Sequence, residues 1–227
     1  MLKLLRKQFK ITNIMAVSVD GKIASHAEES TTERNKNGMV CPADFLRLKT
    51  EVAKCDCVFV SAKSIEVETG AFRISHLKKN LQEPEWIVFT KSGTVSFSHP
   101  FWAQKNIPKA LFQVTDFRID IEPKFEICEI KLRHENINFY IGNISGLIHY
   151  LISQKKSKFA LLGGGKLNAA FWEQNLVNYL KLTLSPLLLG KSDLPSLVSS
   201  SHLLLKKLKC EKLTKSGHFI FIDYKVQ

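Results

Sequence analysis

The chain has 227 residues, of which 44% are hydrophobic and 24% charged, so it is neither disordered nor collagen-like. One large domain or two small ones fit this length, and a core of this size needs no metal or disulfide. Lys and Arg number 33 against 21 Asp and Glu, a net charge of +12. This charge suits a polyanionic partner or a phosphorylated small molecule. The alternative is a solvated Lys-rich surface, which the wide spread of the basic residues favours. No nucleic-acid-binding motif accompanies them, which argues against a nucleic acid as partner.

The five cysteines are odd in number and irregular in spacing: Cys41, Cys55, Cys57, Cys128 and Cys210. No Cys-x-x-Cys and no zinc-type His/Cys spacing occurs, so we predict no metal site. We expect five buried, reduced thiols in a cytoplasmic protein. No run reaches the ~18 apolar residues of a membrane helix, so no membrane association is predicted.

Strand and helix patterns alternate along the first half of the chain. Residues 11–19 read as a strand, and 43–54 as a helix with Pro42 near its start. Short apolar runs at 57–60, 86–89, 110–114 and 125–130 are typical of buried strands.

The pattern is sharper in the second half. Residues 137–141 predict a strand, and 144–152 a helix with one apolar face. A buried strand at 159–162 is followed by three glycines and a helix over 166–175. Residues 180–184 alternate between Leu and polar residues, as in a half-buried strand, and 218–224 form the last strand.

This alternation predicts an α/β fold: a single domain over 1–227, with its core at about 10–224 and a mixed, mostly parallel sheet flanked by helices. The late strands have little helix between them, which suggests an antiparallel edge. An edge strand must be covered, which a second copy of the chain would do.

The strongest local signal is FALLGGGKLNAAF at 159–171. Glycines let a backbone approach phosphate closely, and a helix N-terminus offers free N–H groups. A side chain at Gly164 or Gly165 would block such an approach. The alternative is a tight turn without a ligand, because the motif is neither a Walker A loop nor G-x-G-x-x-G.

Two other strand ends carry polar residues. Asp20 and Lys22 follow the first strand, where ligands of α/β sheets bind, although an Asp-Gly turn explains the same residues. Ser61, Lys63 and Ser64 follow another buried strand and suit a phosphate, including the 2′-phosphate of NADP. Helix capping by Ser61 or Ser64 is the alternative.

The stretches MAVSVDGKIAS at 15–25, CDCVFVSAKSI at 55–65 and LLGGGKLNAAFWEQNLVNYLKLTLSPLLLG at 161–190 resemble the riboflavin-pathway pyrimidine reductase family. That family is the reductase half of the bacterial deaminase-reductase. The resemblance covers about residues 10–224, and the zinc-binding deaminase half is absent.

The resemblance implies a dihydrofolate-reductase-like fold, NADPH as hydride donor and a homodimer. It implies reduction of 5-amino-6-(5-phosphoribosylamino)uracil to the ribitylamino product. The cofactor would contact Ser61, Ser64, Gly164, Gly165, Lys166 and Leu167. It also implies a ligand-facing Asp20. On this basis we predict Asp20 as the catalytic residue, with Lys22 and Glu68 binding the substrate.

The chain departs from the family pattern mainly on the substrate side. Gly163 stands where most members have Glu, and residues 177–179 read Val-Asn-Tyr in place of Val-Asp-Glu. Residues 67–70 and 39–42 also differ. These departures leave a second hypothesis open, a non-catalytic or different-substrate nucleotide-binding paralogue. A third hypothesis, nucleic-acid binding, rests on charge alone.

Overall fold

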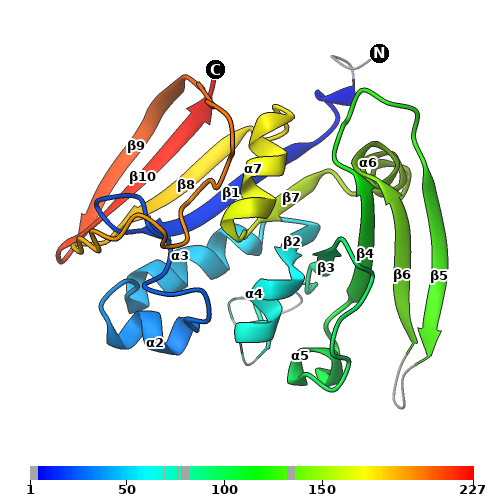
Figure 1. Cartoon of the computed structure of the whole chain (residues 1–227), viewed down its shortest axis with the longest axis horizontal. Coiled ribbons are helices and arrows are strands. Elements are labelled where there is room, and N and C mark those ends of the chain that lie inside the picture. Colours follow the sequence, from blue (N-terminus) through cyan, green and yellow to red (C-terminus); the bar gives the residue numbers. More distant parts are fainter. Residues whose placement is uncertain (1–4, 69, 76, 78–81, 132–135) are drawn as a thin grey trace.

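The computed structural model describes every residue except 1–4, 69, 76, 78–81 and 132–135. The described strands form one ten-stranded sheet in the order β5-β6-β4-β3-β2-β7-β1-β8-β10-β9 (Figure 1). They are β1 Lys10–Val17, β2 Cys57–Ser61, β3 Glu85–Thr90, β4 Lys109–Asp116, β5 Phe125–Lys131, β6 Asn136–Asn143, β7 Lys158–Leu161, β8 Tyr179–Leu184, β9 Leu208–Ser216 and β10 Phe219–Val226.

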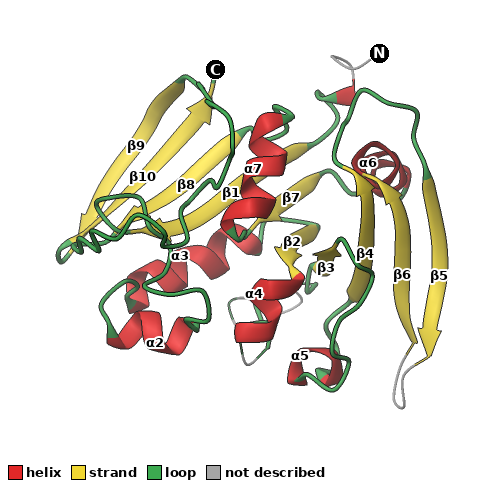
Figure 2. Ribbon diagram, viewed as in Figure 1, coloured by secondary structure: helices red, strands yellow, loops and turns green. Residues whose placement is uncertain are grey.

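Helices cover both faces of this sheet (Figure 2). They are α2 Thr31–Lys36, α3 Pro42–Val52, α4 Ala62–Val67, α5 Pro100–Ala103, α6 Ile144–Ser153 and α7 Gly165–Glu173. Helices α6 and α7 bury their apolar residues against one face, while α3, α4 and α5 pack on the other. Strand β2 lies between these layers, and Phe59 packs its ring against Phe89, Phe159 and Phe171.

The sheet confirms the predicted fold class. The strands from β6 to β8 in the sheet order pair in parallel, and β5, β10 and β9 add antiparallel partners at the two sides. The apolar runs of the central strands follow from burial on both faces. Strand β1 ends two residues before the predicted 19, because Ser18 begins a tight turn.

The predicted antiparallel edge among the late strands is confirmed, since β10 pairs antiparallel with β8 and with β9, which ends the sheet. Strand β9, which the sequence pattern did not predict, is exposed at every residue because it has no apolar alternation to bury. The prediction of five buried thiols was wrong: only Cys57 is buried, while Cys128 and Cys210 are exposed on β5 and β9.

No helix within the described part of the chain is long and apolar enough to cross a membrane.

Candidate active site at the carboxyl ends of the central strands

Three of the sequence motifs meet at one edge of the sheet. Strands β2, β7 and β1 are neighbours and run parallel, so their carboxyl ends lie side by side. The turn at 18–24 follows β1, residues 61–64 follow β2, and the glycine loop at 163–165 follows β7. This edge is where parallel α/β sheets bind ligands.

The glycine loop is held by the end of β2. The backbone N–H of Ser61 donates to the carbonyl of Gly163 at 2.9 Å, and the N–H of Gly164 points at the Ser61 hydroxyl at 3.4 Å. Gly163 has a φ of +89°, a conformation that L side chains rarely adopt. This glycine therefore meets a backbone requirement at the position where the resembling family has Glu.

Ser61 and Ser64 lie against this loop. Ser61 is the N-cap of α4, accepting from the backbone N–H of Ser64, so the capping interpretation is confirmed. The two hydroxyl oxygens are 2.8 Å apart. A Cβ placed on Gly164 would stand 3.7 Å from the Ser64 hydroxyl, which brings both serines beside the start of α7. Lys63 instead pairs with Glu28 at the surface.

The first turn of α7 offers unsatisfied backbone donors. Gly164 is its N-cap and has no side chain. Counting from Gly165, the first residue of α7, the first backbone N–H with an acceptor is that of Asn168, which donates to the carbonyl of Gly164. The N–H groups of Gly165, Lys166 and Leu167 find no acceptor among the described residues. Lys166 is exposed, whereas Leu167 is buried in the core, so Leu167 has only its backbone N–H to offer a ligand.

At Gly165 the packing of the protein itself leaves no room for a side chain. A Cβ at this position would lie 2.3 Å from the carbonyl oxygen of Ser196 and 2.5 Å from the hydroxyl of Ser199. The carbonyl of Gly165 also accepts from the backbone N–H of Ser199. The space that a side chain would fill is thus occupied by the protein itself.

Substitutions at these two neighbouring glycines are expected to have different effects on stability, because only Gly165 is required for packing. Gly165→Ala should lower the free energy of unfolding by about 1–3 kcal/mol, because a Cβ forces the loop at 196–199 to move. Gly164→Ala should change it by less than about 0.5 kcal/mol, because its Cβ makes an ordinary contact. Urea denaturation measures both, and equal losses would contradict this assignment.

The turn after β1 has the geometry of the predicted Asp-Gly turn. The N–H of Gly21 donates to the carbonyl of Ser18, and Gly21 has a φ of +78°. The Asp20 carboxylate accepts from the Ser18 hydroxyl at 2.6 Å and from the backbone N–H groups of Leu189 and Gly190. These hydrogen bonds, the one from Ser18 foremost, lower the pKa of Asp20 to about 2. Asp20 is therefore a fixed anion at neutral pH.

Lys22 and Glu68, the two predicted substrate-side residues, contact other parts of the chain. The Lys22 ammonium donates to the carbonyl of Ser192 at 3.0 Å. The Glu68 carboxylate accepts from the N–H and hydroxyl of Thr31 and pairs with Arg34 at 2.6 Å, which holds the start of α2. Asp20 and Lys22 thus share one turn, and no recorded contact joins Glu68 to either of them. Of the divergent stretch at 67–70, Thr69 lies outside the described residues.

The segment at 187–199 was not identified from the sequence, yet it connects the site. Its backbone N–H groups at Leu189 and Gly190 donate to the Asp20 carboxylate, and its carbonyl at Ser192 accepts from the Lys22 ammonium. Leu197 donates its N–H to the carbonyl of Gly21. At its other end it covers Gly165. Its irregular backbone offers no periodicity from which this position could be predicted.

A buried amide pair behind the glycine loop was also missed. Asn13 and Asn168 are fully buried, and the Asn13 amide donates to the carbonyl of Leu161 at 2.8 Å and to the side-chain oxygen of Asn168 at 3.2 Å. The Asn168 amide donates to the carbonyl of Leu197, and the Trp172 indole donates to Asn13. An Asn within the apolar strand at 11–19 was the available signal.

A further turn lies next to Ser61 in the sheet. Strand β3 pairs with β2 and ends at Thr90, whose hydroxyl is 3.3 Å from that of Ser92. Lys91 is exposed in this turn and has no ion pair among the described residues. This turn adds hydroxyls and a cation to the same edge, on the side away from Asp20.

Comparison with solved structures finds the same fold in named reductases. A pyrimidine reductase-like protein from Corynebacterium diphtheriae aligns with a TM-score of 0.72 at 16% identity, over 99% of this chain and 94% of that one. A Thermotoga maritima deaminase/5-amino-6-(5-phosphoribosylamino)uracil reductase aligns at 0.72 and 15% identity, over 98% of this chain and 58% of that one. The riboflavin biosynthesis reductase of Saccharomyces cerevisiae aligns at 0.65 and 13% identity, over 96% and 90%. No curated protein sequence matches the chain.

The class is therefore a single-domain α/β protein with the dihydrofolate-reductase-like fold of the RibD reductase domain. Residues 10–221 match the model of the RibD C-terminal domain. The chain belongs to this family, and the family resemblance inferred from its motifs is confirmed. It spans about half the length of the two-domain deaminase-reductases that it matches.

Proposed function

We propose that this protein is an NADPH-dependent reductase that converts 5-amino-6-(5-phosphoribosylamino)uracil to its ribitylamino product. The observation that carries the proposal is the glycine loop. Gly164 has no side chain, and the first N–H groups of α7 have no acceptor within the described residues. Both lie beside the hydroxyls of Ser61 and Ser64, at the edge of the sheet where ligands bind in this fold. This donor set fits the phosphates of a dinucleotide.

NADPH, when bound, supplies the hydride that reduces the open-chain ribosylamino group. The N–H groups of Gly165, Lys166 and Leu167 would bind its pyrophosphate, with Ser61 and Ser64 as further donors. The turn at Thr90–Thr94 would meet the adenosine end, because β3 lies on the far side of β2 from β1. Lys91 is a cation available there for the 2′-phosphate of NADPH, and Lys63 would serve by exchanging its ion pair with Glu28 for the phosphate.

The substrate would lie toward the turn after β1. Asp20 would act as a fixed carboxylate that orients the substrate, because its lowered pKa leaves it no proton to donate at neutral pH. Lys22 and Glu68 stay predictions as substrate-binding residues. Lys22 would exchange its contact with the Ser192 carbonyl for a substrate phosphate, and Glu68 would act from the start of α2.

A non-catalytic or different-substrate nucleotide-binding paralogue is the second candidate. Two observations favour it: neutral Gly163 replaces an acid of the family pattern, and the Asp20 carboxylate is already used to hold residues 189–190.

Titration of the purified protein with NADPH and NADH tests the proposal. We expect NADPH to bind with a dissociation constant in the micromolar range, and NADH at least ~10-fold more weakly, because it lacks the 2′-phosphate. Gly164→Val should weaken NADPH binding by ~10-fold or more, since a branched side chain would stand over the Ser64 hydroxyl. Ala103→Val, at an exposed position on α5, is the matched control. Failure of both cofactors to bind would contradict the proposal.

We also propose that the protein is a homodimer in the cytoplasm. Free thiols at the surface, Cys128 and Cys210, suit a reducing compartment. The edge of the sheet beyond β8 supports the dimer. Leu182, Ile222 and Leu213 lie opposite one another on β8, β10 and β9, so they form an apolar row on one face of the sheet. At the end of this row the Leu213 side chain is 62% exposed. An uncovered edge strand with exposed leucines is a surface that a second copy would cover.

Sedimentation equilibrium at micromolar concentration tests this assembly. The wild type is expected to sediment as a dimer with a standard interface of ~1,600 Å² or more in total. Leu213→Glu should shift it to monomer, since a carboxylate would be buried without a partner. Ile127→Glu, at an equally apolar but 50% exposed position on β5 at the opposite edge, should leave the dimer intact. A monomeric wild type would refute the dimer.

A further inference from the structure

A basic pocket of about 470 Å³ opens at the edge of the sheet opposite the candidate active site. Lys10 begins β1 and Lys225 lies near the end of the antiparallel β10, so the pocket borders the amino ends of the parallel strands. Strand β1 has eight residues, which places the pocket and the Asp20 turn about 25 Å apart along the strand. The two are separate sites.

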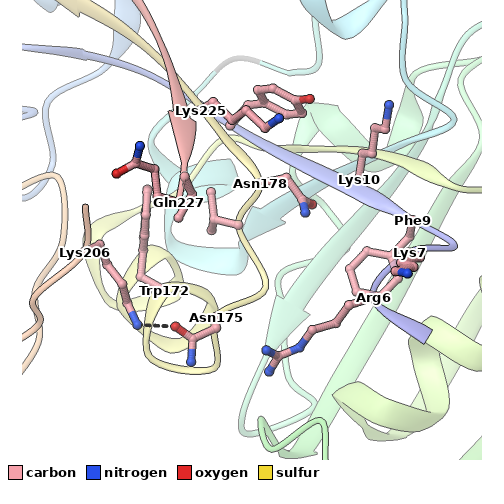
Figure 3. A pocket seen from close by; sticks show the side chains of 13 residues that line it. Arg6, Lys7, Phe9, Lys10, Trp172, Asn175, Asn178, Lys206, Lys225 and Gln227 are labelled. Carbon is pink, nitrogen blue, oxygen red and sulfur yellow. Dashed lines mark hydrogen bonds between the residues drawn. The ribbon is translucent and has the colours of Figure 1, made fainter. Parts of the chain in front are cut away.

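The lining of this pocket carries five cationic side chains and no acidic one. The cations are Arg6, Lys7, Lys10, Lys206 and Lys225. They come from the N-terminal segment, the start of β1, the segment before β9, and β10. Figure 3 shows Arg6, Lys7 and Lys10 on one side, Lys206 and Gln227 on the other, and Asn178 between them.

These cations are not neutralised within the described part of the chain. None of the five forms a recorded ion pair with a carboxylate there. Lys206 donates to the side-chain oxygen of Asn175, and one Arg6 nitrogen donates to the carbonyl of Gln174 at 2.9 Å. The Nε of Arg6 is buried and has no hydrogen-bond partner, although buried donors are nearly always paired.

Amide and aromatic groups complete the lining. Asn178 accepts from the backbone N–H of Ile11 through its side-chain oxygen at 2.7 Å, which leaves its amide group as a donor. Tyr179 and Trp172 add ring surface beside the cations. Like charges gathered in one concave surface repel each other and attract a multiply charged anion. The volume is in the range of small-molecule sites.

We propose that this basic pocket is a second ligand site, which binds a phosphorylated small molecule with two or more negative charges. The inference does not depend on the proposed reductase activity, since none of the five cations belongs to the candidate active site. Lysines and an arginine with unpaired donors are the groups that recognise phosphate, and the rings provide room for an attached base or sugar.

Isothermal titration calorimetry with inorganic pyrophosphate tests the site, and variants of the pocket lysines distinguish binding there from binding at the glycine loop. The wild type is expected to bind one pyrophosphate per chain. Lys10→Gln/Lys225→Gln should weaken binding by ~10-fold or more, because two charge-assisted contacts are lost. Both lysines are exposed, so the fold should persist; Lys7→Gln provides a second variant if it does not.

The matched control is Lys36→Gln/Lys105→Gln, which removes the same charge from exposed positions outside the pocket and outside the edge strand β9. It should bind pyrophosphate within ~2-fold of the wild type. Equal weakening by the two double variants, or no binding by the wild type, would overturn the proposal. Tighter binding of a short single-stranded oligonucleotide, lost in the pocket variants, would overturn it in favour of a nucleic-acid backbone. Adenosine, which lacks phosphate, should not bind.

Discussion

Asp20→Asn is expected to lower NADPH-dependent turnover of 5-amino-6-(5-phosphoribosylamino)uracil by roughly 100-fold or more, the scale of a positioned charged group. The variant should fold and should still bind NADPH, because the hydrogen bonds of the Asp20 side chain within the described residues go to Ser18, Leu189 and Gly190 and not to the glycine loop. Asn removes the negative charge. It also presents an amide nitrogen to one of the three donors that the carboxylate accepts from. The variant therefore loses both the negative charge of residue 20 and a hydrogen bond that fixes the turn after β1.

The assay follows NADPH oxidation at 340 nm, with Asp193→Asn as the matched control. Asp193 lies in the same segment at 187–199, is 68% exposed and pairs only with Lys191 at the surface. Its variant should retain wild-type turnover. Wild-type turnover in Asp20→Asn would remove Asp20 from the site. A wild type that binds NADPH but shows no turnover would favour the different-substrate or non-catalytic paralogue.

The ionisation of Asp20 gives this prediction a pH dependence. Hydrogen bonds lower its pKa from 3.8 to about 2, so the anion is favoured by folding. Its contact with residues 189–190 is complete above pH ~4 and is lost as the pH falls toward 2. Between pH 5 and 9 the profile of kcat/KM should show no inflection from Asp20. An acid limb in that range, absent in Asp20→Asn, would contradict a fixed-anion role.

Asn13→Leu should lower the free energy of unfolding by about 3 kcal/mol or more. The substitution keeps the branching at Cγ but removes the amide that three buried groups contact: the indole N–H of Trp172, the carbonyl of Leu161 and the side-chain oxygen of Asn168. Each such group costs about 1–3 kcal/mol when it stays unpaired. Because the Asn pair supports the glycine loop from behind, NADPH affinity should fall as well.

Urea denaturation of a double-mutant cycle isolates the indole contact. Trp172→Phe should be less destabilising in the Asn13→Leu background than in the wild type, because the unpaired donor is then removed. Asn35→Leu, at an exposed position of α2, is the control and should change stability by less than about 0.5 kcal/mol. Equal costs of Trp172→Phe in both backgrounds would show that the hydrogen bond contributes nothing.

The sequence alone predicted most of the parallel strands and both long helices of the second half. Buried strands such as Cys57–Ser61 and one-faced helices such as Ile144–Ser153 have local periodicities that report burial directly. Helix α4 was missed because its six residues are too few for a periodic signal. Strand β9 was missed because neither of its faces is buried.

For the candidate site, the sequence placed the motifs at strand ends, and the parallel sheet then required the ends of β1, β2 and β7 to meet. The contacts that each side chain makes could not be predicted from the sequence. Glu68 stays a predicted substrate-binding residue, but the contacts of its carboxylate with Thr31 and Arg34 had no signal in the sequence. Gly165 was assigned to cofactor access, yet its missing side chain makes room for Ser196.

What the sequence by itself determined is thus the fold class, the order of its elements and the position of its glycine and Asp-Gly turns, because these depend on neighbours within a few residues. Only the tertiary structure decided which segments cover one another. The segment at 187–199 reaches back to Asp20, and the basic pocket joins Arg6 to Lys225. Such contacts link residues more than 150 positions apart, and they depend on chain packing that no local pattern of polarity encodes.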